Sequence, residues 1–267
     1  MHGRYLPADC DLLFPAHLSV GAAADSAHEY TLKQYLMTAR QDTANLEMCK
    51  VSPSTLPFLL NNMVDLRFTS HVLNNLMFIS PNRHLLYVTD SNTYRGDNRY
   101  THHFEHLSCF LPGLLALGVH TLPLNHLEDI GLNYTALADD LLLDARMGYK
   151  ELASFNLADL HLWAAEGLAQ TCYLTYADQP TGLGPDIITV RSGGLHPEIP
   201  WMVAMQEWKR QGRRGLPPGV GDKRPWTGDS NNTTDMLSRE TSITGKDYYI
   251  RNSEYQLRPE VSKAFSL

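Results

Sequence analysis

Apolar side chains recur at helical spacing in the segment 157–176, whose sequence is LADLHLWAAEGLAQTCYLTY. Residues three or four positions apart share one face of an α-helix, so this spacing predicts an amphipathic helix. A loop rich in proline and glycine, DQPTGLGP, follows directly and predicts that the helix ends before it. The residues near the apolar face are Leu157, Leu160, Ala164, Leu168 and Cys172.

Three other segments have helical patterns. The segment 25–40 carries apolar residues at roughly helical spacing, and a second candidate helix runs from about Thr55 to Leu76. The very apolar segment 104–118 also predicts a helix. We expect that helix to break or kink at Pro112-Gly113, because proline removes a backbone donor and clashes with the preceding turn.

Short apolar runs on both sides of Ser80-Pro81-Asn82 predict a β-hairpin. From 187 to 246 the chain is polar and poorly periodic, which predicts a long irregular insertion. A core helix is expected to resume only at Arg258-Pro259-Glu260, because proline and an acidic residue suit the first turn of a helix. The whole pattern predicts an all-α fold with minor β-hairpins.

Composition and charge exclude several classes of protein. The chain has 267 residues, of which 43% are hydrophobic and 19% charged, as in ordinary globular proteins. Its net charge of −7 disfavours a nucleic-acid partner, since nucleic-acid-binding proteins usually present a basic face. No apolar run reaches the length of a membrane span, and the N-terminal segment lacks the layout of a signal peptide. Three basic pairs lie among glycines and prolines, where a solvated loop is the favoured interpretation: Lys209-Arg210, Arg213-Arg214 and Lys223-Arg224.

The cysteines and glycosylation tripeptides leave several interpretations open. Cys10, Cys49, Cys109 and Cys172 include no CxxC pair, which makes a zinc site a poor interpretation. Spacing alone does not decide between free thiols and disulfides. Acceptor tripeptides for N-linked glycosylation begin at Asn133 and at the overlapping positions 231 and 232. Such tripeptides often arise by chance, so they only weakly indicate a secretory protein.

Asp25 and Glu260 are the acidic residues whose positions suggest chemistry, because each lies at or near the start of a predicted helix. In a barrel of helices, such positions can converge at one end. Two carboxylates facing a sugar are the usual arrangement for glycoside hydrolysis. By pattern alone, a helix cap is the favoured role for either acid. His106 lies beside an apolar run, where a satisfied core histidine is favoured over a catalyst.

Four segments, in order along the chain, share a resemblance to one family. They are GAAADSAHEYTLKQYL (21–36), EHLSCFLPGLLALG (105–118), TCYLTYADQPTGLGPD (171–186) and YQLRPEV (255–261). Together they resemble the class I α-1,2-mannosidases of glycoside hydrolase family 47. The resemblance implies an (α/α)7 barrel, of the six-hairpin or seven-hairpin glycosidase type. Residues 1–267 would form an incomplete part of that catalytic domain. The implied reaction removes terminal α-1,2-linked mannose from high-mannose N-glycans with inversion.

The resemblance assigns roles to five residues. Asp25 matches one of the family's active-site carboxylates, and Glu260 matches the carboxylate usually given the role of base. Arg258 would line the sugar site, with His106 close to it. Glu29 matches a position that orders the same region and is expected to contribute to substrate binding.

The resemblance also implies a disulfide, a metal ion and a compartment. Cys109 and Cys172 match the two cysteines that the family joins. A disulfide and the glycosylation tripeptides fit the secretory pathway, in the endoplasmic reticulum or the Golgi. The family uses a Ca²⁺ ion whose threonine ligand lies downstream of the Leu-Arg-Pro-Glu motif, so no calcium ligand can be named in this chain. Any membrane association is expected to come from segments absent here.

Departures from the family pattern keep alternatives open. Lys263 stands where the family has a glutamate, within one turn of Glu260. The family's general-acid glutamate is expected to lie outside this sequence, so the chain alone is expected to be inactive. The alternatives are a non-catalytic, lectin-like protein that binds high-mannose glycans and a gene fragment without function.

Overall fold

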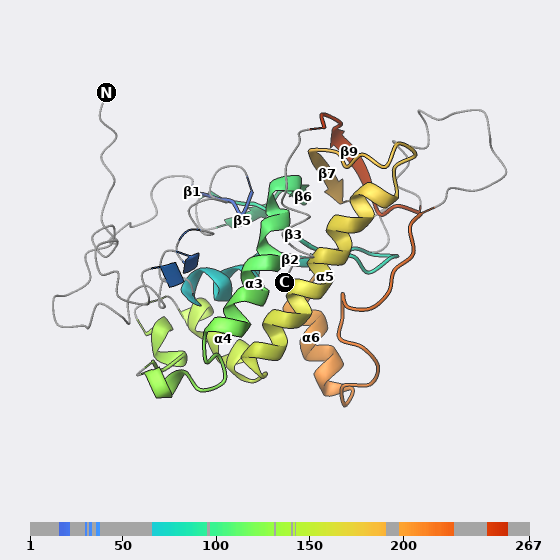
Figure 1. Ribbon diagram of the computed structural model, residues 1–267. Helices are drawn as coiled ribbons and strands as arrows, with labels where there is room; N and C mark the ends of the chain where they lie inside the picture. Colours follow the sequence, from blue (N-terminus) through green and yellow to red (C-terminus); the bar gives the residue numbers. More distant parts are fainter. Residues whose placement is uncertain are drawn as a thin grey trace, which may run out of the picture.

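A computed structural model shows how the elements are arranged (Figure 1). The residues that it describes are 16–21, 30, 32–33, 36–37, 66–94, 97–130, 132–139, 141, 143–190, 198–226 and 245–255. The longer helices among them are α3 (Leu111–Thr121), α4 (Leu143–Ala153), α5 (Leu157–Ala177) and α6 (Trp201–Arg210). The shorter ones are the π-helix η2 (Val72–Leu76) and the 3₁₀ helices η3 (His106–Phe110), η4 (Leu127–Ile130) and η5 (Thr135–Ala138).

Helix α5 confirms the helix predicted for 157–176 and extends it by one residue. Its start is fixed by Asn156, whose side-chain oxygen accepts a 2.9 Å hydrogen bond from the backbone N–H of Asp159. Such a cap satisfies one of the backbone donors that the first turn leaves free. All five residues named for the apolar face are buried. The local pattern was therefore sufficient to predict this helix.

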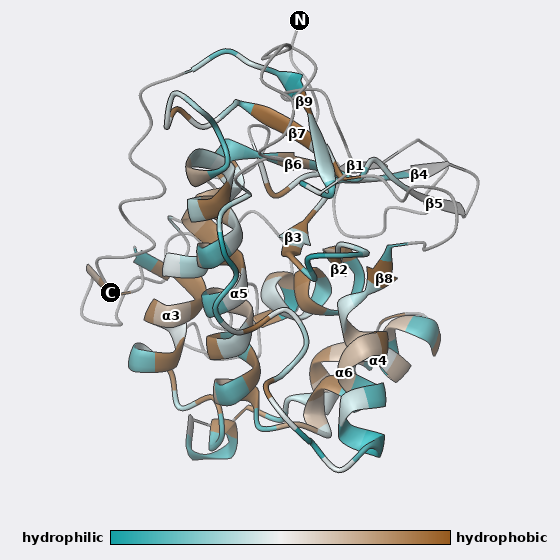
Figure 2. Cartoon of the chain, turned by 90° about the vertical axis from the view of Figure 1, so that its right-hand side faces the viewer, coloured by the Kyte–Doolittle hydropathy of each residue, from teal (hydrophilic) through white to brown (hydrophobic). Residues whose placement is uncertain are grey.

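Helices α3 and α5 lie side by side at the centre of the core, and Figure 2 shows hydrophobic residues on both. Helix α5 also closely approaches strand β3 (Leu86–Val88) at Gly167. A Cβ atom at Gly167 would lie 2.8 Å from Leu86 Cδ2 and 2.9 Å from the carbonyl oxygen of Gly219, so no larger residue fits without displacement. The buried leucines of the two helices are Leu111, Leu114, Leu115, Leu157, Leu160, Leu168 and Leu174.

The described strands form three antiparallel sheets of three strands each. The first has the order β1 (Ala16–Leu18), β4 (Ser91–Tyr94), β5 (Asp97–Tyr100). The second has the order β3, β2 (Met77–Ile79), β8 (Ile199–Pro200). The third has the order β6 (His103–Glu105), β7 (Ile187–Val190), β9 (Tyr248–Asn252), and it brings together segments far apart in the sequence.

The hairpin predicted around Ser80-Pro81-Asn82 is confirmed. Strands β2 and β3 pair with Met77 opposite Val88 and Ile79 opposite Leu86. The connecting turn is closed by a 2.9 Å hydrogen bond from the backbone N–H of Ser80 to the carbonyl oxygen of Leu85. The hydroxyl oxygen of Ser80 in turn accepts a 2.9 Å hydrogen bond from the backbone N–H of Leu85.

The helix predicted for 104–118 is confirmed from His106 onward, but the break predicted at Pro112-Gly113 is wrong. The segment contains the end of strand β6, the 3₁₀ helix η3 and most of α3. Pro112 lies in the first turn of α3 and does not break or kink the helix interior. Proline is tolerated there because the first-turn N–H groups have no partner within the helix.

The irregular insertion predicted for 187–246 is wrong in three places, one of which is strand β8. Strand β7 begins at Ile187 and lies between β6 and β9, and the segment 201–210 forms helix α6. Trp201 and Met205 of α6 are fully buried, and Trp201 Nε1 donates a 2.8 Å hydrogen bond to the carbonyl oxygen of Pro218. The apolar stripe of α6 is short, which explains why the pattern did not reveal it.

The basic pair Lys209-Arg210 also departs from the prediction of a solvated loop, because it forms the last turn of α6. Cations are favourable at this end of a helix, where the backbone carbonyls carry partial negative charge. Lys209 Nζ donates a 2.7 Å hydrogen bond to the carbonyl oxygen of Ser154 and lies 4.8 Å from the centre of the Phe155 ring. Lys209 therefore helps to attach α6 to the end of α4, whereas Arg210 pairs with Glu207 within α6.

The other helix predictions are confirmed where the structure describes them. Residues 66–71 are α-helical and continue into η2, within the candidate helix 55–76. In the candidate helix 25–40, the described residues Tyr30, Leu32, Lys33, Leu36 and Met37 are helical. Helices thus dominate the described part, as expected. The strands, however, were expected only as hairpins, whereas the third sheet joins three distant segments.

Candidate active site

His106 is the first residue of η3, directly after strand β6, and its side chain contacts the end of helix α5. Its ring is buried, and Nε2 shares a hydrogen bond with the hydroxyl of Tyr176 in the last turn of α5. The centres of the two rings are 5.4 Å apart. The backbone N–H of His106 donates a 2.8 Å hydrogen bond to the carbonyl oxygen of Asp186. Main-chain and side-chain contacts together fix the position of this ring.

A disulfide between Cys109 and Cys172 holds the same two elements together. It joins η3 to α5, with 6.0 Å between the two Cα atoms, and both cysteines are fully buried. His106 lies three residues before Cys109, and Tyr176 lies four residues after Cys172. The disulfide therefore lies about one helical turn from the His106–Tyr176 hydrogen bond and stabilises the alignment of both partners. The pairing expected from the resemblance is confirmed.

The sheet β6–β7–β9 joins the strand that precedes His106 to β9, which comes before the Arg258-Pro259-Glu260 motif in the sequence. Figures 1 and 2 show this sheet at the end of α5 that carries Tyr176. Strand β9 ends at Asn252, opposite Ile187 of β7. Asn252 Nδ2 donates a 3.1 Å hydrogen bond to a carboxylate oxygen of Asp186, whose carbonyl binds the His106 N–H. Asn252 precedes Arg258 by six residues in the sequence.

The segment 16–21, which precedes Asp25 in the sequence, also packs close to His106. Gly21 is buried against the side chain of Glu105, the residue before His106. A Cβ atom at Gly21 would overlap the Glu105 carboxylate, so this close contact requires glycine. The carboxylate of Asp90 accepts a 3.3 Å hydrogen bond from the backbone N–H of Val20 and holds the segment in position. Gly21 precedes Asp25 by four residues.

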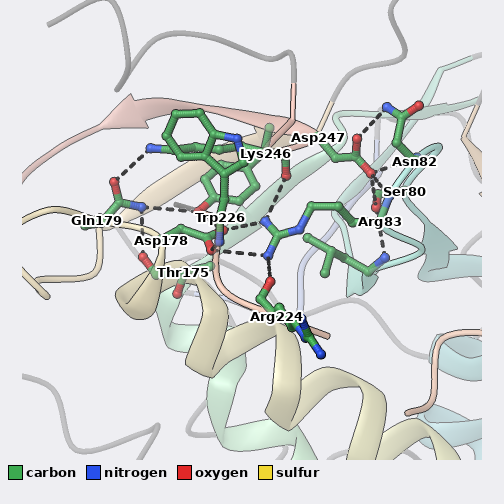
Figure 3. Close-up of polar contacts among 12 residues, drawn as sticks. Ser80, Asn82, Arg83, Thr175, Asp178, Gln179, Arg224, Trp226, Lys246 and Asp247 are labelled. Atoms are coloured by element: carbon green, nitrogen blue, oxygen red, sulfur yellow. Dashed lines mark hydrogen bonds and ion pairs between the residues drawn. The ribbon is translucent and has the colours of Figure 1, made fainter. Parts of the chain in front are cut away.

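A buried polar cluster lies beside this region and connects the start of β9 to the end of α5 (Figure 3). Asp178, the residue after α5, accepts hydrogen bonds of 2.5 and 3.2 Å from the guanidinium of Arg83. It also accepts one of 2.9 Å from the hydroxyl of Tyr248 and one of 2.6 Å from the backbone N–H of Trp226. Burial, followed by the charge of Asp178, raises the pKa of Tyr248 well above its ordinary value.

Asp247 completes the cluster from the residue before Tyr248. It is fully buried, and its carboxylate accepts a 2.7 Å hydrogen bond from the Ser80 hydroxyl. It accepts three more from the turn between β2 and β3, from the backbone and side chain of Asn82 and the backbone of Arg83. Because each carboxylate is surrounded by donors, this cluster is suited to fixing the backbone rather than to proton transfer.

Lys246 is the remaining charge in the cluster. Its side chain is fully buried, and its ammonium lies 4.8 Å from the centre of the Trp226 ring. It also donates a 3.4 Å hydrogen bond to the side-chain oxygen of Gln179. Figure 3 shows Lys246 and Asp247 pointing to opposite sides of the strand start. Sequence reasoning missed the whole cluster, because no spacing rule relates residues as distant as Ser80 and Asp247.

The chain matches one family of known proteins along most of its length. The family model described as "Glycosyl hydrolase family 47" matches residues 5–265. The chain belongs to glycosyl hydrolase family 47. This match includes His106, both disulfide cysteines and the four segments that carry the resemblance.

Several curated proteins are similar to this family 47 chain. The rat "Endoplasmic reticulum mannosyl-oligosaccharide 1,2-alpha-mannosidase" is 28% identical over 174 residues, which are 65% of the chain and 18% of the relative. The "Mannosyl-oligosaccharide 1,2-alpha-mannosidase" of Candida albicans is 29% identical over 177 residues, 66% of the chain and 25% of the relative. The "Mannosyl-oligosaccharide alpha-1,2-mannosidase IA" of Drosophila melanogaster is 25% identical over 64% of the chain and 18% of the relative. The matches thus span about a quarter or less of these relatives.

A solved structure, "alpha-1,2-mannosidase from Trichoderma reesei", resembles the chain with a TM-score of 0.47 and 14% identity. The match covers 94% of the chain and 34% of the solved structure. This TM-score and identity are too low to establish the fold.

The structure places only some of the predicted site residues. His106, Cys109 and Cys172 are described and lie together. Asp25, Glu29, Arg258 and Glu260 lie outside the described residues, so their convergence stays a prediction. Tyr176 is the site residue that sequence reasoning missed. Its position four residues after Cys172, on the turn facing His106, was the signal that could have revealed it.

Among the described residues, no group of three or more histidine, cysteine, aspartate or glutamate side chains could hold a metal ion. Within that same part, no helix is both long and apolar enough to cross a membrane.

Proposed function

We propose that this chain is part of an α-1,2-mannosidase that removes terminal α-1,2-linked mannose from high-mannose N-glycans with inversion. Membership of glycosyl hydrolase family 47 supports the reaction class, and the names of the relatives from rat and Candida albicans support the substrate. An inverting reaction needs an acid and a base carboxylate with a water between them. We assign Glu260 as the base and Asp25 as a second active-site carboxylate.

The convergence of two chain segments beside His106 carries this proposal. Gly21 contacts Glu105, and Asn252 is bonded to Asp186, the residue that also binds the His106 backbone. A chain of four residues spans at most about 14 Å, and one of eight at most about 29 Å. Asp25 and Glu260, at these separations from Gly21 and Asn252, are therefore both within reach of His106.

The remaining roles concern sugar binding. The ring of His106, held by its hydrogen bond with Tyr176, offers a fixed imidazole to a sugar hydroxyl. We assign Arg258 and Glu29 to the same subsite. There the guanidinium donates hydrogen bonds to sugar hydroxyls, and the carboxylate accepts hydrogen bonds from them. The proposed calcium dependence rests on the family resemblance alone, and we assign no step of the reaction to the ion. The buried Cys109–Cys172 disulfide supports a secretory location, since such bonds persist in oxidising compartments.

The test measures mannose release by the full-length native product that contains this chain, using a high-mannose glycan as substrate. We expect ¹H NMR to detect the β-anomer of mannose first, because inversion at an α-linkage produces it. Glu260→Gln should reduce the rate by at least about 100-fold, since it removes a general base. Glu254→Gln, at an exposed position, is the matched control and should leave the rate unchanged.

Two results would contradict the proposal. One is mannose release that Glu260→Gln does not affect, and the other is an α-anomer as the first product. Glycan binding by the native product without any mannose release would instead favour the lectin-like alternative. The 267-residue chain by itself, measured in parallel, tests the separate expectation that it is inactive alone.

A further inference from the structure

The tripeptide Asn133-Tyr134-Thr135 lies at the protein surface, with its middle residue anchored in the interior. Asn133 and Thr135 are exposed, whereas Tyr134 is partly buried and packs against the core. The Tyr134 hydroxyl forms a 2.6 Å hydrogen bond with Ser70, and its ring lies 5.3 Å from the ring of Tyr149. The anchor faces inward and therefore holds the two outer residues of the tripeptide on the solvent side.

The side-chain amide of Asn133 has its two ends in different surroundings. Its oxygen accepts hydrogen bonds of 2.9 Å from the Thr135 hydroxyl and 3.1 Å from the Thr135 backbone N–H. It also accepts one of 3.3 Å from the backbone N–H of Ala136, at the start of η5. Among the described residues, no hydrogen bond uses Asn133 Nδ2. Because Asn133 is exposed, its nitrogen is open to substitution while its oxygen binds the first N–H groups of η5.

The surroundings leave room for a large substituent on this nitrogen. Asn133 and Thr135 are among the residues that line a surface cavity of about 530 Å³. Its lining combines leucines with the polar side chains of Asn125, Glu128 and Asn156. Such a mixed surface suits a sugar ring, which has both apolar C–H faces and hydroxyl edges. A sugar attached to Asn133 thus begins at an open surface and not inside the core.

We propose that Asn133 carries an N-linked glycan. In this modification, Nδ2 of Asn133 loses a proton and forms a bond to C1 of the first sugar. The bond between that C1 and the diphosphate oxygen of a lipid-linked oligosaccharide donor breaks, and the lipid diphosphate leaves. The acceptor pattern requires the Thr135 hydroxyl, which here contacts the Asn133 amide. The buried Cys109–Cys172 disulfide indicates the oxidising compartment in which this transfer takes place.

The inference does not depend on the proposed hydrolysis, because the tripeptide is distant in the sequence from every residue assigned to the active site. Glycosylation keeps the cap, since an amide oxygen remains on Asn133 after Nδ2 is substituted. Enzymatic removal of the glycan would leave an aspartate at position 133, and its carboxylate can also accept the N–H hydrogen bonds of η5.

The test isolates the native protein from its source and removes N-glycans with an amidase in ¹⁸O-labelled water. Trypsin then produces the peptide 100–146, in which Asn133 is the single acceptor asparagine, separate from the tripeptides at 231 and 232. We expect mass spectrometry to find ¹⁸O-labelled aspartate at position 133. A native protein whose peptide contains only unmodified Asn133 would overturn the proposal.

Two substitutions, expressed in the same cells, distinguish labelling caused by a glycan from labelling caused by spontaneous deamidation. Thr135→Ala should abolish labelling completely, because it removes the hydroxyl while keeping Asn133 and its hydrogen bond to the backbone of residue 135. Thr135→Ser keeps a hydroxyl and should retain labelling. Labelling that persists in Thr135→Ala would also overturn the proposal, since it would then arise from deamidation and not from a glycan.

Discussion

His106 and Tyr176 share a hydrogen bond between Nε2 and the phenol oxygen, although 70 positions separate them in the sequence. The disulfide between Cys109 and Cys172, one turn away on each element, holds the two backbones in this alignment. The imidazole therefore has a fixed orientation before any ligand arrives. A ring held in this way loses little rotational freedom on binding, which favours affinity.

Tyr176→Phe tests this relationship. It removes the hydroxyl but keeps the ring, so we expect a loss of about 1 kcal/mol in the free energy of unfolding. If His106 binds the sugar, mannose release by the native product should fall several-fold at a temperature where both proteins are folded. Tyr173→Phe, on the exposed side of α5, is the control. Equal rates for Tyr176→Phe and wild type would show that the His106 ring needs no such support.

Replacing Cys109 and Cys172 together by alanine should lower the free energy of unfolding by about 4 kcal/mol, since the bond closes a long loop in the unfolded chain. The two cysteines are 63 residues apart. Urea denaturation of both proteins measures the difference. Reducing agent should destabilise the wild type and leave the double variant unchanged. Equal sensitivity of both to reduction would contradict the assignment of this disulfide as the stabilising one.

Asp178→Asn should destabilise the protein by about 3 kcal/mol, because it leaves the Arg83 charge in a mostly buried place without its partner. The side chain of Asp178 is fully buried and that of Arg83 is 13% exposed. Thermal or urea unfolding measures the loss. Asp139→Asn makes the same chemical change at an exposed position and should have almost no effect. A small effect of Asp178→Asn would mean that Arg83 finds other acceptors after relaxation.

His161 should make stability depend on pH. Complete burial lowers its pKa from 6.5 to about 4, and among the described residues its Nδ1 has no hydrogen-bond partner. The folded state therefore keeps the ring neutral, while the unfolded state binds a proton below about pH 6.5. The stabilisation is fully present above that pH and is lost as the pH falls toward 4. The loss amounts to at most about 3 kcal/mol.

Urea denaturation at several pH values compares the wild type with His161→Leu. The variant should lose the part of the pH dependence between 6.5 and 4 that His161 contributes, and the part that the partly buried His71 and His102 contribute should remain. His126→Gln replaces a side chain that is 71% exposed and should retain the wild-type dependence. Identical pH profiles for wild type and His161→Leu would contradict the assignment.

Part of the candidate site could be predicted and part could not. The resemblance supplied the disulfide pairing of Cys109 with Cys172 and placed His106 in the site, because short motifs report inherited positions. It did not supply Tyr176 as the partner of His106, since that contact depends on how η3 meets the end of α5. The positions of Asp25 and Glu260 lie outside the described residues and stay predictions.

The sequence by itself determined the elements whose geometry is local. Helix α5 follows from apolar spacing and the Asn156 cap, and the β2–β3 hairpin follows from two apolar runs around a turn. Only the tertiary structure decided that Arg83 pairs with Asp178, 95 positions away, and that Asp247 binds Ser80, 167 positions away. Periodicity reports which face of one element is apolar. It contains no information about which distant element packs there, and burial of that contact is what makes its hydrogen bonds necessary.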